Sequence, residues 1–277
     1  MKIVSTTCLI FGLAVAALSP AAAQEKITIA TEGAYAPWNF TTADGKPDGM
    51  EVELALNLCG RMKIECTVVT QDWDGLIPAL TVGKFDVIMA SMYITDKRLE
   101  VIDFTQAYAI DPAGFAVAKD SPLAGLAAEK ISLADEAKAK TVIEQMKPML
   151  KGKVIGVQAS TLNLEFVKTY FADTVEIREY KTTEQHDLDL AAGRIDGIFA
   201  QQTVLAATLA KPEFAGFAVA GPGFFAGTFG RGTGAGLRKE DTALKDKLNK
   251  AIDEAIADGT IKTLSLKWLK ADVTPAK

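Results

Sequence analysis

The sequence has little of what metal-binding and nucleic-acid-binding proteins depend on. It contains one histidine and three cysteines, and its 30 lysines and arginines are outnumbered by 35 acidic residues, for a formal net charge of −5. This balance lacks the basic footprint of a nucleic-acid-binding protein. No set of three or four soft ligands is available for a metal ion, so we expect neither a metal nor a cofactor.

The short motifs of hydrolytic enzymes are also missing. The sequence contains no Gly-x-Ser-x-Gly, no His-Glu-x-x-His and no cysteine–histidine arrangement. The glycine-rich stretch Gly230–Gly236 lacks the strand–turn–helix setting of a nucleotide loop, so we interpret it as a chain crossing and the start of a strand. His186 lies in the polar segment Glu184–Asp189, and we interpret it as a solvated helix residue.

The N-terminus has the pattern of a cleavable signal peptide over residues 1–23. Lys2 supplies a positive charge, Leu9–Leu18 forms an apolar run, and Ala21–Ala23 provides small residues for cleavage after Pro20. The apolar run is too short to span a bilayer. We therefore predict an exported, soluble mature protein that begins at Gln24.

Two cysteines, Cys59 and Cys66, remain in the predicted mature chain. Export places them in an oxidising compartment, where a pair so close in sequence most simply forms one disulfide. The bridge closes a short loop, so we expect a modest contribution to stability.

Strands alternate with helices in two successive units, which predicts an α/β architecture. Each unit favours right-handed crossovers between parallel strands, with helices on both faces of the sheet. The C-terminal segment returns to the first unit, so the chain crosses between lobes twice, near Ala109–Pro112 and Pro222–Gly230. The expected strands span residues 26–31, 66–69, 85–90, 114–118, 153–158, 175–180, 194–200 and 234–237.

One stretch, Phe85–Arg98, combines a buried strand with a candidate binding residue. Thr95 is a good N-cap for a helix that starts after it. Arg98 would then lie at the mouth formed where the strand ends, and a planar guanidinium suits a carboxylate there. An alternative is a surface arginine paired with Glu100 or Asp96.

Two further groups of residues have both a functional and a structural interpretation. Ser160 and Thr161 follow a strand and begin a helix, so their backbone N–H groups could hold an anion or could simply cap the helix. Glu32 has aromatic residues nearby in sequence or in the predicted fold, which suits a cationic ligand group. The alternative is a solvated carboxylate beside core aromatics. The aromatic residues are Tyr35, Trp38 and Trp73.

The motifs Ser91–Arg98 (SMYITDKR) and Tyr35–Trp38 (YAPW) resemble those of the polar amino-acid branch of periplasmic solute-binding proteins, family 3, which serve ABC importers. The resemblance extends through nearly all of the mature chain. It implies an α/β, two-lobed type II periplasmic-binding-protein fold, in which each lobe has a mixed, mostly parallel sheet with helices on both faces. The first lobe would comprise residues 24–110 with a return segment, residues 225–277, and the second lobe residues 111–224.

The resemblance also implies roles for individual residues. Arg98 would clamp a ligand α-carboxylate, with help from the backbone of Ser160 and Thr161. Glu32 would receive a distal cation, and the rings of Tyr35 and Trp73 would enclose the aliphatic stem. A disulfide between Cys59 and Cys66 fits basic amino-acid binders. The predicted ligand-binding residues are Glu32, Tyr35, Trp38, Trp73, Ala90, Ser91, Met92, Tyr93, Arg98, Ser160, Thr161 and Gln201.

Two departures from the family pattern bear on the ligand. Gln201 stands where the family commonly has an aspartate for the α-ammonium, and Tyr93 replaces a small hydroxyl residue. Segments such as Ala30–Asn39, Glu179–Thr182 and Asp258–Trp268 are similar to the opine-binding members. An opine carries a second carboxylate beside its ammonium, and an amide tolerates that carboxylate better than an aspartate does.

We therefore expect the periplasmic, monomeric binding component of an ABC importer, which closes on a small zwitterion and delivers it to a membrane permease. The expected ligand is an arginine-type opine, such as octopine or nopaline, or a basic amino acid. One alternative is a receptor for a neutral polar amino acid such as glutamine. Another is an enzyme of the cyclohexadienyl-dehydratase type on the same fold, with Glu32 as its acid or base.

Overall fold

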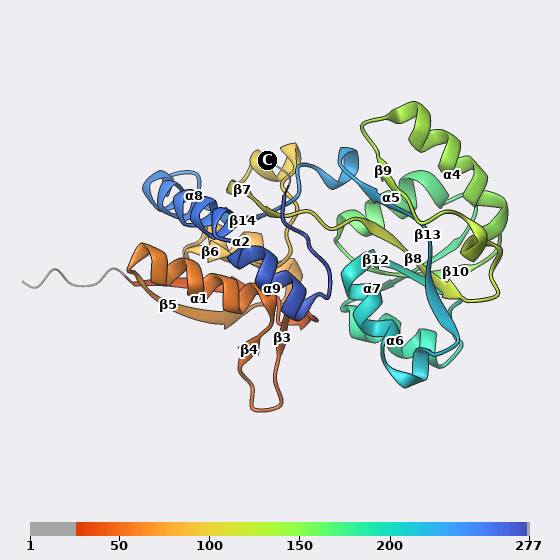
Figure 1. Ribbon diagram of the computed structural model, residues 1–277, viewed down its shortest axis with the longest axis horizontal. Helices are drawn as coiled ribbons and strands as arrows, with labels where there is room; N and C mark the ends of the chain where they lie inside the picture. Colours follow the sequence, from red (N-terminus) through yellow and green to blue (C-terminus); the bar gives the residue numbers. More distant parts are fainter. Residues whose placement is uncertain (1–25, 276–277) are drawn as a thin grey trace, which may run out of the picture.

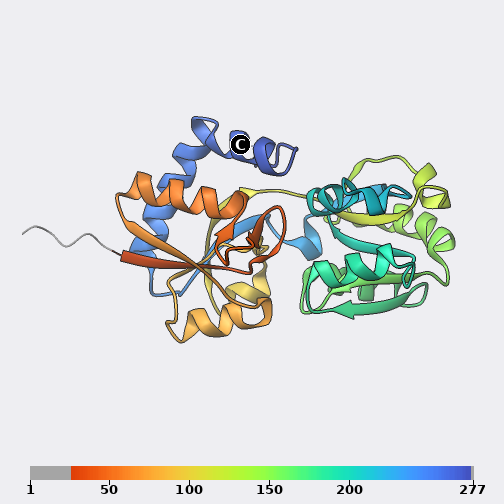
Figure 2. The same cartoon turned by 90° about the horizontal axis from the view of Figure 1, so that it is seen from below.

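The computed structural model describes residues 26–275, so the predicted signal peptide lies outside the described residues. Two lobes, each built around its own β-sheet, lie side by side and are joined by extended chain crossings (Figure 1 and Figure 2). Within this range, no helix has both the length and the apolar character needed to cross a membrane. The predicted two-lobed α/β architecture is confirmed.

The first lobe contains a five-stranded mixed sheet in the order β5–β1–β6–β14–β7. β1 pairs in parallel with β5 and β6, whereas β14 pairs antiparallel with β6 and β7. A small sheet of β2, β3 and β4 follows β1 in the chain. The strands are β1 (Lys26–Thr31), β2 (Ala34–Tyr35), β3 (Asn39–Thr41), β4 (Pro47–Asp48), β5 (Glu65–Thr70), β6 (Val87–Ile88), β7 (Asp103–Ala109) and β14 (Thr233–Leu237).

Alternation along β1 explains how this sheet is covered on both faces. Ile27 and Ile29 belong to the core formed with α1, α8 and α9, whereas Ala30 belongs to the core on the opposite face with α2. Successive side chains of a strand point to opposite faces, so the neighbours Ile29 and Ala30 enter different cores. The helices are α1 (Met50–Met62), α2 (Leu76–Thr81), α3 (Asp96–Leu99), α8 (Thr242–Ala257) and α9 (Thr260–Trp268), with a 3-10 turn η1 (Trp73–Gly75).

The second lobe contains a six-stranded sheet in the order β11–β10–β12–β8–β13–β9. β10 is parallel to β11 and β12, and β8 runs antiparallel to β12 and β13. Phe115, Phe166 and Phe199 are fully buried at the centre of its core. The strands are β8 (Ala113–Ala118), β9 (Lys130–Ser132), β10 (Val154–Gln158), β11 (Glu176–Tyr180), β12 (Gly197–Gln201) and β13 (Phe217–Phe225).

Helices cover both faces of this second sheet. Residues of α4 and α5 share one core with β8 and β10, and residues of α6 and α7 contribute to the core on the other face. The helices are α4 (Glu136–Leu150), α5 (Leu162–Phe171), α6 (Thr183–Ala191) and α7 (Gln202–Leu209), and the 3-10 turns are η2 (Pro122–Gly125), η3 (Pro212–Phe214) and η4 (Gly227–Phe229).

The two crossings between lobes lie at residues 110–112 and 226–232. The sequence placed the start of the second crossing at Pro222, but β13 continues to Phe225 because Phe224 is buried in the second core and Phe225 pairs with Ser132 of β9. Gly230 has a φ of 63°, and a Cβ there would lie 1.9 Å from the carbonyl oxygen of Ile94. The glycine-rich stretch is therefore a crossing followed by β14, as predicted.

Some local expectations were wrong. β7, β9 and β13 were not predicted, and His186 is not solvated, because it is 0% exposed on α6 and its ring packs edge-on against Tyr180. The segment around His186 is polar, but residues of α6 face the second sheet at helical spacing, and His186 occupies one of those positions.

The predicted disulfide between Cys59 and Cys66 is confirmed. It joins α1 to β5, with the two Cα atoms 6.1 Å apart. Cys59 is buried in the first core, whereas Cys66 is partly buried on β5. The bridge therefore fixes the turn between these two elements.

We expect loss of this disulfide to lower the free energy of unfolding by about 2 kcal/mol, the contribution of a short closed loop. The measurement is urea denaturation of the mature protein and of a Cys59→Ala/Cys66→Ser double variant. Reduced wild-type protein should match the variant, and the variant itself should not respond to reductant. Equal stability of oxidised wild type and variant would contradict the expected contribution.

Candidate functional site

The candidate site lies between the lobes, where the carboxyl ends of strands from both sheets face each other. Glu32 follows β1, Ala90 and Ser91 follow β6, Thr161 follows β10, and Gln201 ends β12. In open α/β sheets, ligands bind outside the carboxyl ends of the strands. The fold thus gathers residues from distant parts of the chain at one place.

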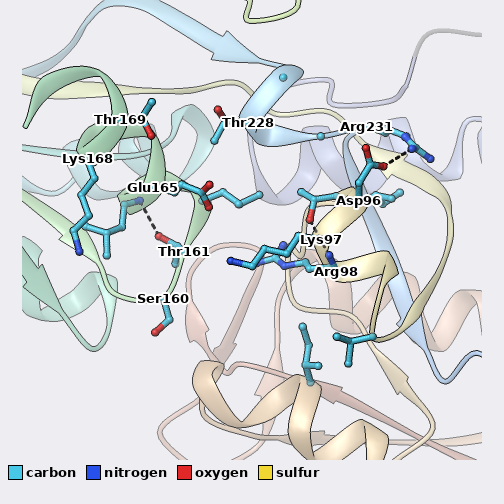
Figure 3. A pocket seen from close by; sticks show the side chains of 18 residues that line it. Asp96, Lys97, Arg98, Ser160, Thr161, Glu165, Lys168, Thr169, Thr228 and Arg231 are labelled. Carbon is cyan, nitrogen blue, oxygen red and sulfur yellow. Dashed lines mark hydrogen bonds and ion pairs between the residues drawn. The ribbon is translucent and has the colours of Figure 1, made fainter.

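Two cavities that share part of their lining occupy this region. An outer cavity of about 1000 Å³ opens at the mouth, and Figure 3 shows Arg98 of the first lobe facing Ser160 and Thr161 of the second across it. An inner cavity of about 20 Å³ lies deeper, and Arg98, Thr161 and Leu162 line both. The inner cavity has room for about one water molecule, so an amino acid enters only when the lobes separate further.

The inner cavity brings together seven of the predicted residues, namely Glu32, Tyr35, Trp73, Ala90, Tyr93, Arg98 and Thr161. Ser160 and Met92 lie nearby, beside Trp73 and Arg98 in a neighbouring part of the cleft. Trp38 does not reach the cavity, because it is fully buried and its Nε1 donates to Thr203 Oγ1 at 2.8 Å. Sequence reasoning missed three lining residues: Gln158, Leu162 and Asn163.

Arg98 is positioned by the N-terminus of α3. Thr95 caps this helix by accepting the Arg98 backbone N–H at 3.3 Å, as predicted. The guanidinium donates to the Tyr93 carbonyl at 2.8 Å and lies 5.5 Å from the centre of the Trp73 ring. Burial lowers the pKa of Arg98 to about 10, and the group still carries its charge at neutral pH.

The second lobe faces Arg98 with the start of α5. Thr161 caps this helix by accepting the Leu164 N–H at 3.2 Å, and its hydroxyl donates to the Gln158 carbonyl at 2.7 Å. Within residues 26–275, no hydrogen bond occupies the backbone N–H of Ser160 or Thr161. Free N–H groups at a helix start favour negative charge. This edge and Arg98 can therefore hold one anionic group between them.

Glu32 of the first lobe also lines the inner cavity. It is 7% exposed, and its Oε1 accepts a 2.6 Å hydrogen bond from Gln158 Nε2. The pKa of Glu32 is raised to about 7, chiefly by burial, with a smaller contribution from the nearby carboxylates of Glu51 and Asp72, while the Gln158 hydrogen bond acts in the opposite direction. A cation beside Glu32 would lower this pKa again, because an opposite charge favours the ionised carboxylate.

Aromatic rings also line the inner cavity, from Tyr35, Trp73 and Tyr93. Burial raises the pKa values of Tyr35 and Tyr93 above the usual range, so both phenols stay neutral. The Tyr93 hydroxyl donates to the Asp111 carbonyl at 3.2 Å, and its ring packs 5.5 Å from that of Phe229. Tyr93 thus contacts both crossings between the lobes, at residues 110–112 and 226–232.

Polar groups on the crossing side of the site retain unused hydrogen-bonding capacity. Ser91 Oγ donates to Gln201 Oε1 at 2.9 Å, whereas the buried Gln201 Nε2 has no partner in the described part of the chain. The buried Oδ1 of Asn163, which lines the inner cavity, is likewise without one. A buried donor and a buried acceptor without partners are costly unless a ligand or water pairs with them.

A buried carboxylate that was not predicted holds the loop after β6. Glu51, on α1, is 0% exposed and accepts hydrogen bonds from the Ser91 N–H at 2.6 Å, from Asn39 Nδ2 at 2.7 Å and from the Tyr108 hydroxyl. Ser91 has a φ of 50°, in the left-handed region that non-glycine residues seldom adopt. Glu51 therefore fixes the turn that carries Ala90–Tyr93. Its position between Met50 and Val52 in the buried part of α1 was the available sequence signal.

Comparisons with known proteins agree with this geometry. The model of the bacterial extracellular solute-binding proteins, family 3, matches residues 27–271. The octopine-binding periplasmic protein of Rhizobium meliloti is 47% identical, in an alignment that covers 92% of this chain and 94% of that protein. The L-arginine-binding protein of Pseudomonas aeruginosa is 35% identical over 264 residues, which cover 94% of each. The structure of an ancestral arginine-binding protein bound to arginine superposes with a TM-score of 0.73 at 27% identity, covering 88% of this chain and 98% of that one.

We expect Glu51→Ala to lower the free energy of unfolding by about 3 kcal/mol, because it leaves three buried donors without an acceptor. Urea denaturation measures the change. The control is Glu65→Gln, which removes the exposed ion pair with Lys26 and should change stability by less than about 1 kcal/mol. Equal losses in the two variants would show that Glu51 does not hold the loop.

Proposed function

Since the chain belongs to family 3 of the bacterial extracellular solute-binding proteins, we propose that it binds an arginine-type opine, such as octopine, or a basic amino acid between its lobes. The chain is a solute-binding protein and not an enzyme: the relatives described above are named for the solutes they bind. The observation that carries the proposed ligand class is that two side chains of opposite charge, Arg98 and Glu32, line one cavity.

In this proposal, the ligand's α-carboxylate lies between Arg98 and the free N–H groups of Ser160 and Thr161. A guanidinium can donate two parallel hydrogen bonds to a carboxylate, and the start of α5 adds donors from the other lobe. The distal cation lies at Glu32, and the aliphatic stem passes between Tyr35 and Trp73. Ala90, Ser91, Met92 and Tyr93 form the adjoining wall.

Gln201 favours an opine over a simple α-amino acid. Its unpartnered amide N–H can donate to the second carboxylate that an opine carries beside its ammonium. An aspartate in this place would repel that carboxylate. A basic amino acid lacks this carboxylate, and its ammonium would have to use acceptors such as Asn163 Oδ1.

Binding couples to closure because the anion site uses residues of both lobes. A ligand shifts the population toward the closed form only by its greater affinity for that form. Direct contacts already join the lobes near the cavity, including a 2.9 Å hydrogen bond from Trp73 Nε1 to the Ser160 carbonyl and a 2.7 Å ion pair between Lys181 and Asp72. These contacts contribute to the stability of the closed form whichever ligand is bound.

We also propose a place and a partner for this receptor. Residues 1–23 would direct export to the periplasm and be removed, and the mature protein would deliver its ligand as a monomer to an ABC permease. The periplasmic location named for the Rhizobium meliloti relative supports this proposal. We propose lobe limits at residues 24–110, 111–224 and 225–277; the division of strands between the two sheets supports them except at Phe225, which still belongs to β13 of the second sheet.

A thermal-shift screen of the mature protein tests the ligand class. A ligand that binds only the folded protein raises the melting temperature as its concentration increases. At a hundredfold excess over Kd it adds about 2.7 kcal/mol to the free energy of unfolding. We expect octopine, arginine, lysine or ornithine to raise it, and glutamate to have little effect. The control is Arg98→Met, which should abolish the response. A response only to neutral or acidic ligands would contradict the role of Glu32.

The affinity for a cationic ligand should rise with pH through the pKa of Glu32, about 7. A ligand cation binds the carboxylate better than the protonated acid, so binding expels a proton at and below this pH. Arginine affinity should fall about tenfold from about pH 8 to about pH 6, as titration of one such group requires.

Calorimetry in two buffers of different ionisation enthalpy measures both this affinity and the released protons. Glu32→Gln should bind arginine more weakly and lose the pH dependence. A pH profile that is the same in Glu32→Gln and wild type would exclude Glu32 as the group that meets the cation.

A further inference from the structure

Trp38 joins the two lobes beside the first crossing, outside the ligand cavity. Its side chain is fully buried in the first core, and its Nε1 donates to Thr203 Oγ1 of α7, in the second lobe, at 2.8 Å. The Thr203 hydroxyl in turn donates to Asp111 Oδ2 at 2.6 Å. Asp111 is the middle residue of the crossing at residues 110–112. A chain of two hydrogen bonds therefore runs from the first lobe through the second lobe to the crossing itself.

The same crossing supplies acceptors for the start of α7. Gln201 occupies the cap position of this helix, and its side chain makes no capping hydrogen bond. Asp111 Oδ2 accepts the backbone N–H of Thr203 at 3.3 Å, and the Pro112 carbonyl accepts that of Gln202 at 2.8 Å. The first N–H groups of a helix need acceptors from outside the helix. The start of α7 is therefore bound to the crossing as well as to the second sheet.

Apolar packing divides α7 between the two lobes. Val204 is 2% exposed and belongs to the first core, together with Trp38, Tyr108 and Ala109. Its neighbour Leu205 belongs to the core of the second lobe. If the start of α7 left the first lobe, Val204 would be exposed to water, which is unfavourable for an apolar side chain. Burial of Val204 therefore favours the same attachment as the hydrogen bonds.

We infer that Trp38, Thr203 and Asp111 form a pivot, which keeps the start of α7 on the first lobe in both the open and the closed form and limits how far the lobes separate. When two lobes rotate about their crossings, atoms move in proportion to their distance from the axis. The hydrogen bond between Trp73 and the Ser160 carbonyl, at the mouth, must break when the lobes open. The pivot lies beside a crossing, so its hydrogen bonds can persist.

The pivot acts on binding without contacting the ligand. A ligand that binds the closed form has an apparent affinity that depends on the fraction of the free protein in that form. A pivot that limits opening raises this fraction for every solute equally. Trp38 is then a positioning residue, and its inference does not depend on which ligand class is correct.

The first test measures distances between the lobes in the unliganded protein. Trp38→Phe keeps an aromatic ring and removes the Nε1–H donor. Spin labels at Val82→Cys in the first lobe and Leu188→Cys in the second, at side chains 72% and 63% exposed, report the distance by double electron–electron resonance. We expect Trp38→Phe to broaden the distribution toward longer distances. An unchanged distribution would mean that the contact serves only the closed form, and the pivot would be wrong.

The second test measures Kd values for arginine and lysine by calorimetry. Loss of one hydrogen bond in Trp38→Phe should weaken both by the same factor, about 2- to 10-fold. A change in the ratio of the two Kd values would place Trp38 beside the ligand and contradict the inference. The distance measurement uses no ligand, so it still decides the inference if neither amino acid binds and the proposed ligand class fails.

The matched control is Trp268→Phe. Trp268 Nε1 donates to Glu53 Oε2 at 2.7 Å, and both residues belong to the first lobe. This variant loses the same kind of hydrogen bond without disturbing a contact between lobes. Its distance distribution and Kd values should match those of the wild type, even if its stability falls. Equal broadening in both tryptophan variants would indicate a general loosening of the first lobe and would overturn the inference.

A double-mutant cycle tests whether Trp38 acts through Thr203. Thr203→Val nearly keeps the shape of the side chain but removes the hydroxyl that links Trp38 to Asp111. This variant should also broaden the distance distribution and weaken binding. Adding Trp38→Phe to it should cause no further loss of affinity, because the bond that Trp38 makes is already absent. If the two losses add, the two residues act independently and no pivot joins them.

Discussion

The burial of the Glu32 carboxylate is the constraint around which the cleft is built. A charged group removed from water needs compensation from hydrogen bonds or an opposite charge, and otherwise it takes up a proton. Glu32 has one amide hydrogen bond from Gln158, and its pKa of about 7 reflects how incomplete that compensation is. In the proposed function, a ligand cation completes it. Under that proposal, the site gains most from a solute that brings a positive charge to Glu32 while offering a carboxylate to Arg98.

The same constraint connects binding with the motion of the lobes. Glu32 belongs to the first lobe and its hydrogen-bond donor to the second, so the environment of the carboxylate depends on how far the lobes have closed. Ser160 and Trp73 make a similar contact near the anion end. Tyr93 contacts both crossings, through its hydroxyl at Asp111 and its ring at Phe229. A ligand that touches both ends stabilises closure through contacts that neither lobe supplies alone.

Buried polar residues outside the cavity hold this arrangement in place. Glu51 fixes the turn at Ser91, and Asp111 accepts hydrogen bonds from the hydroxyl and the N–H of Thr203 at the first crossing. Burial raises the pKa of Asp111 to about 7, so this group also depends on its few partners. Trp38 donates to the same Thr203 hydroxyl from the first lobe. Trp38 therefore supports the region of the crossing, although its sequence motif suggested a place beside the ligand.

Local sequence pattern is enough to predict those strands and helices that depend on neighbouring residues. β1 is an alternating strand, Thr95 and Thr161 are caps, and the short spacing of Cys59 and Cys66 indicates one disulfide, because each of these features depends on residues close together in the chain. Arg98 was recognisable as a candidate because it lies in a short helix capped by Thr95, and Glu32 because aromatic residues lie near it. Strand pairing between distant segments and the burial of polar residues depend on tertiary packing, which periodicity does not show. β7, β9 and β13 are stabilised by partners distant in sequence, and His186 and Glu51 are polar residues that packing buries. Gln158 meets Glu32 because two lobes face each other, and no local pattern relates residues 126 positions apart.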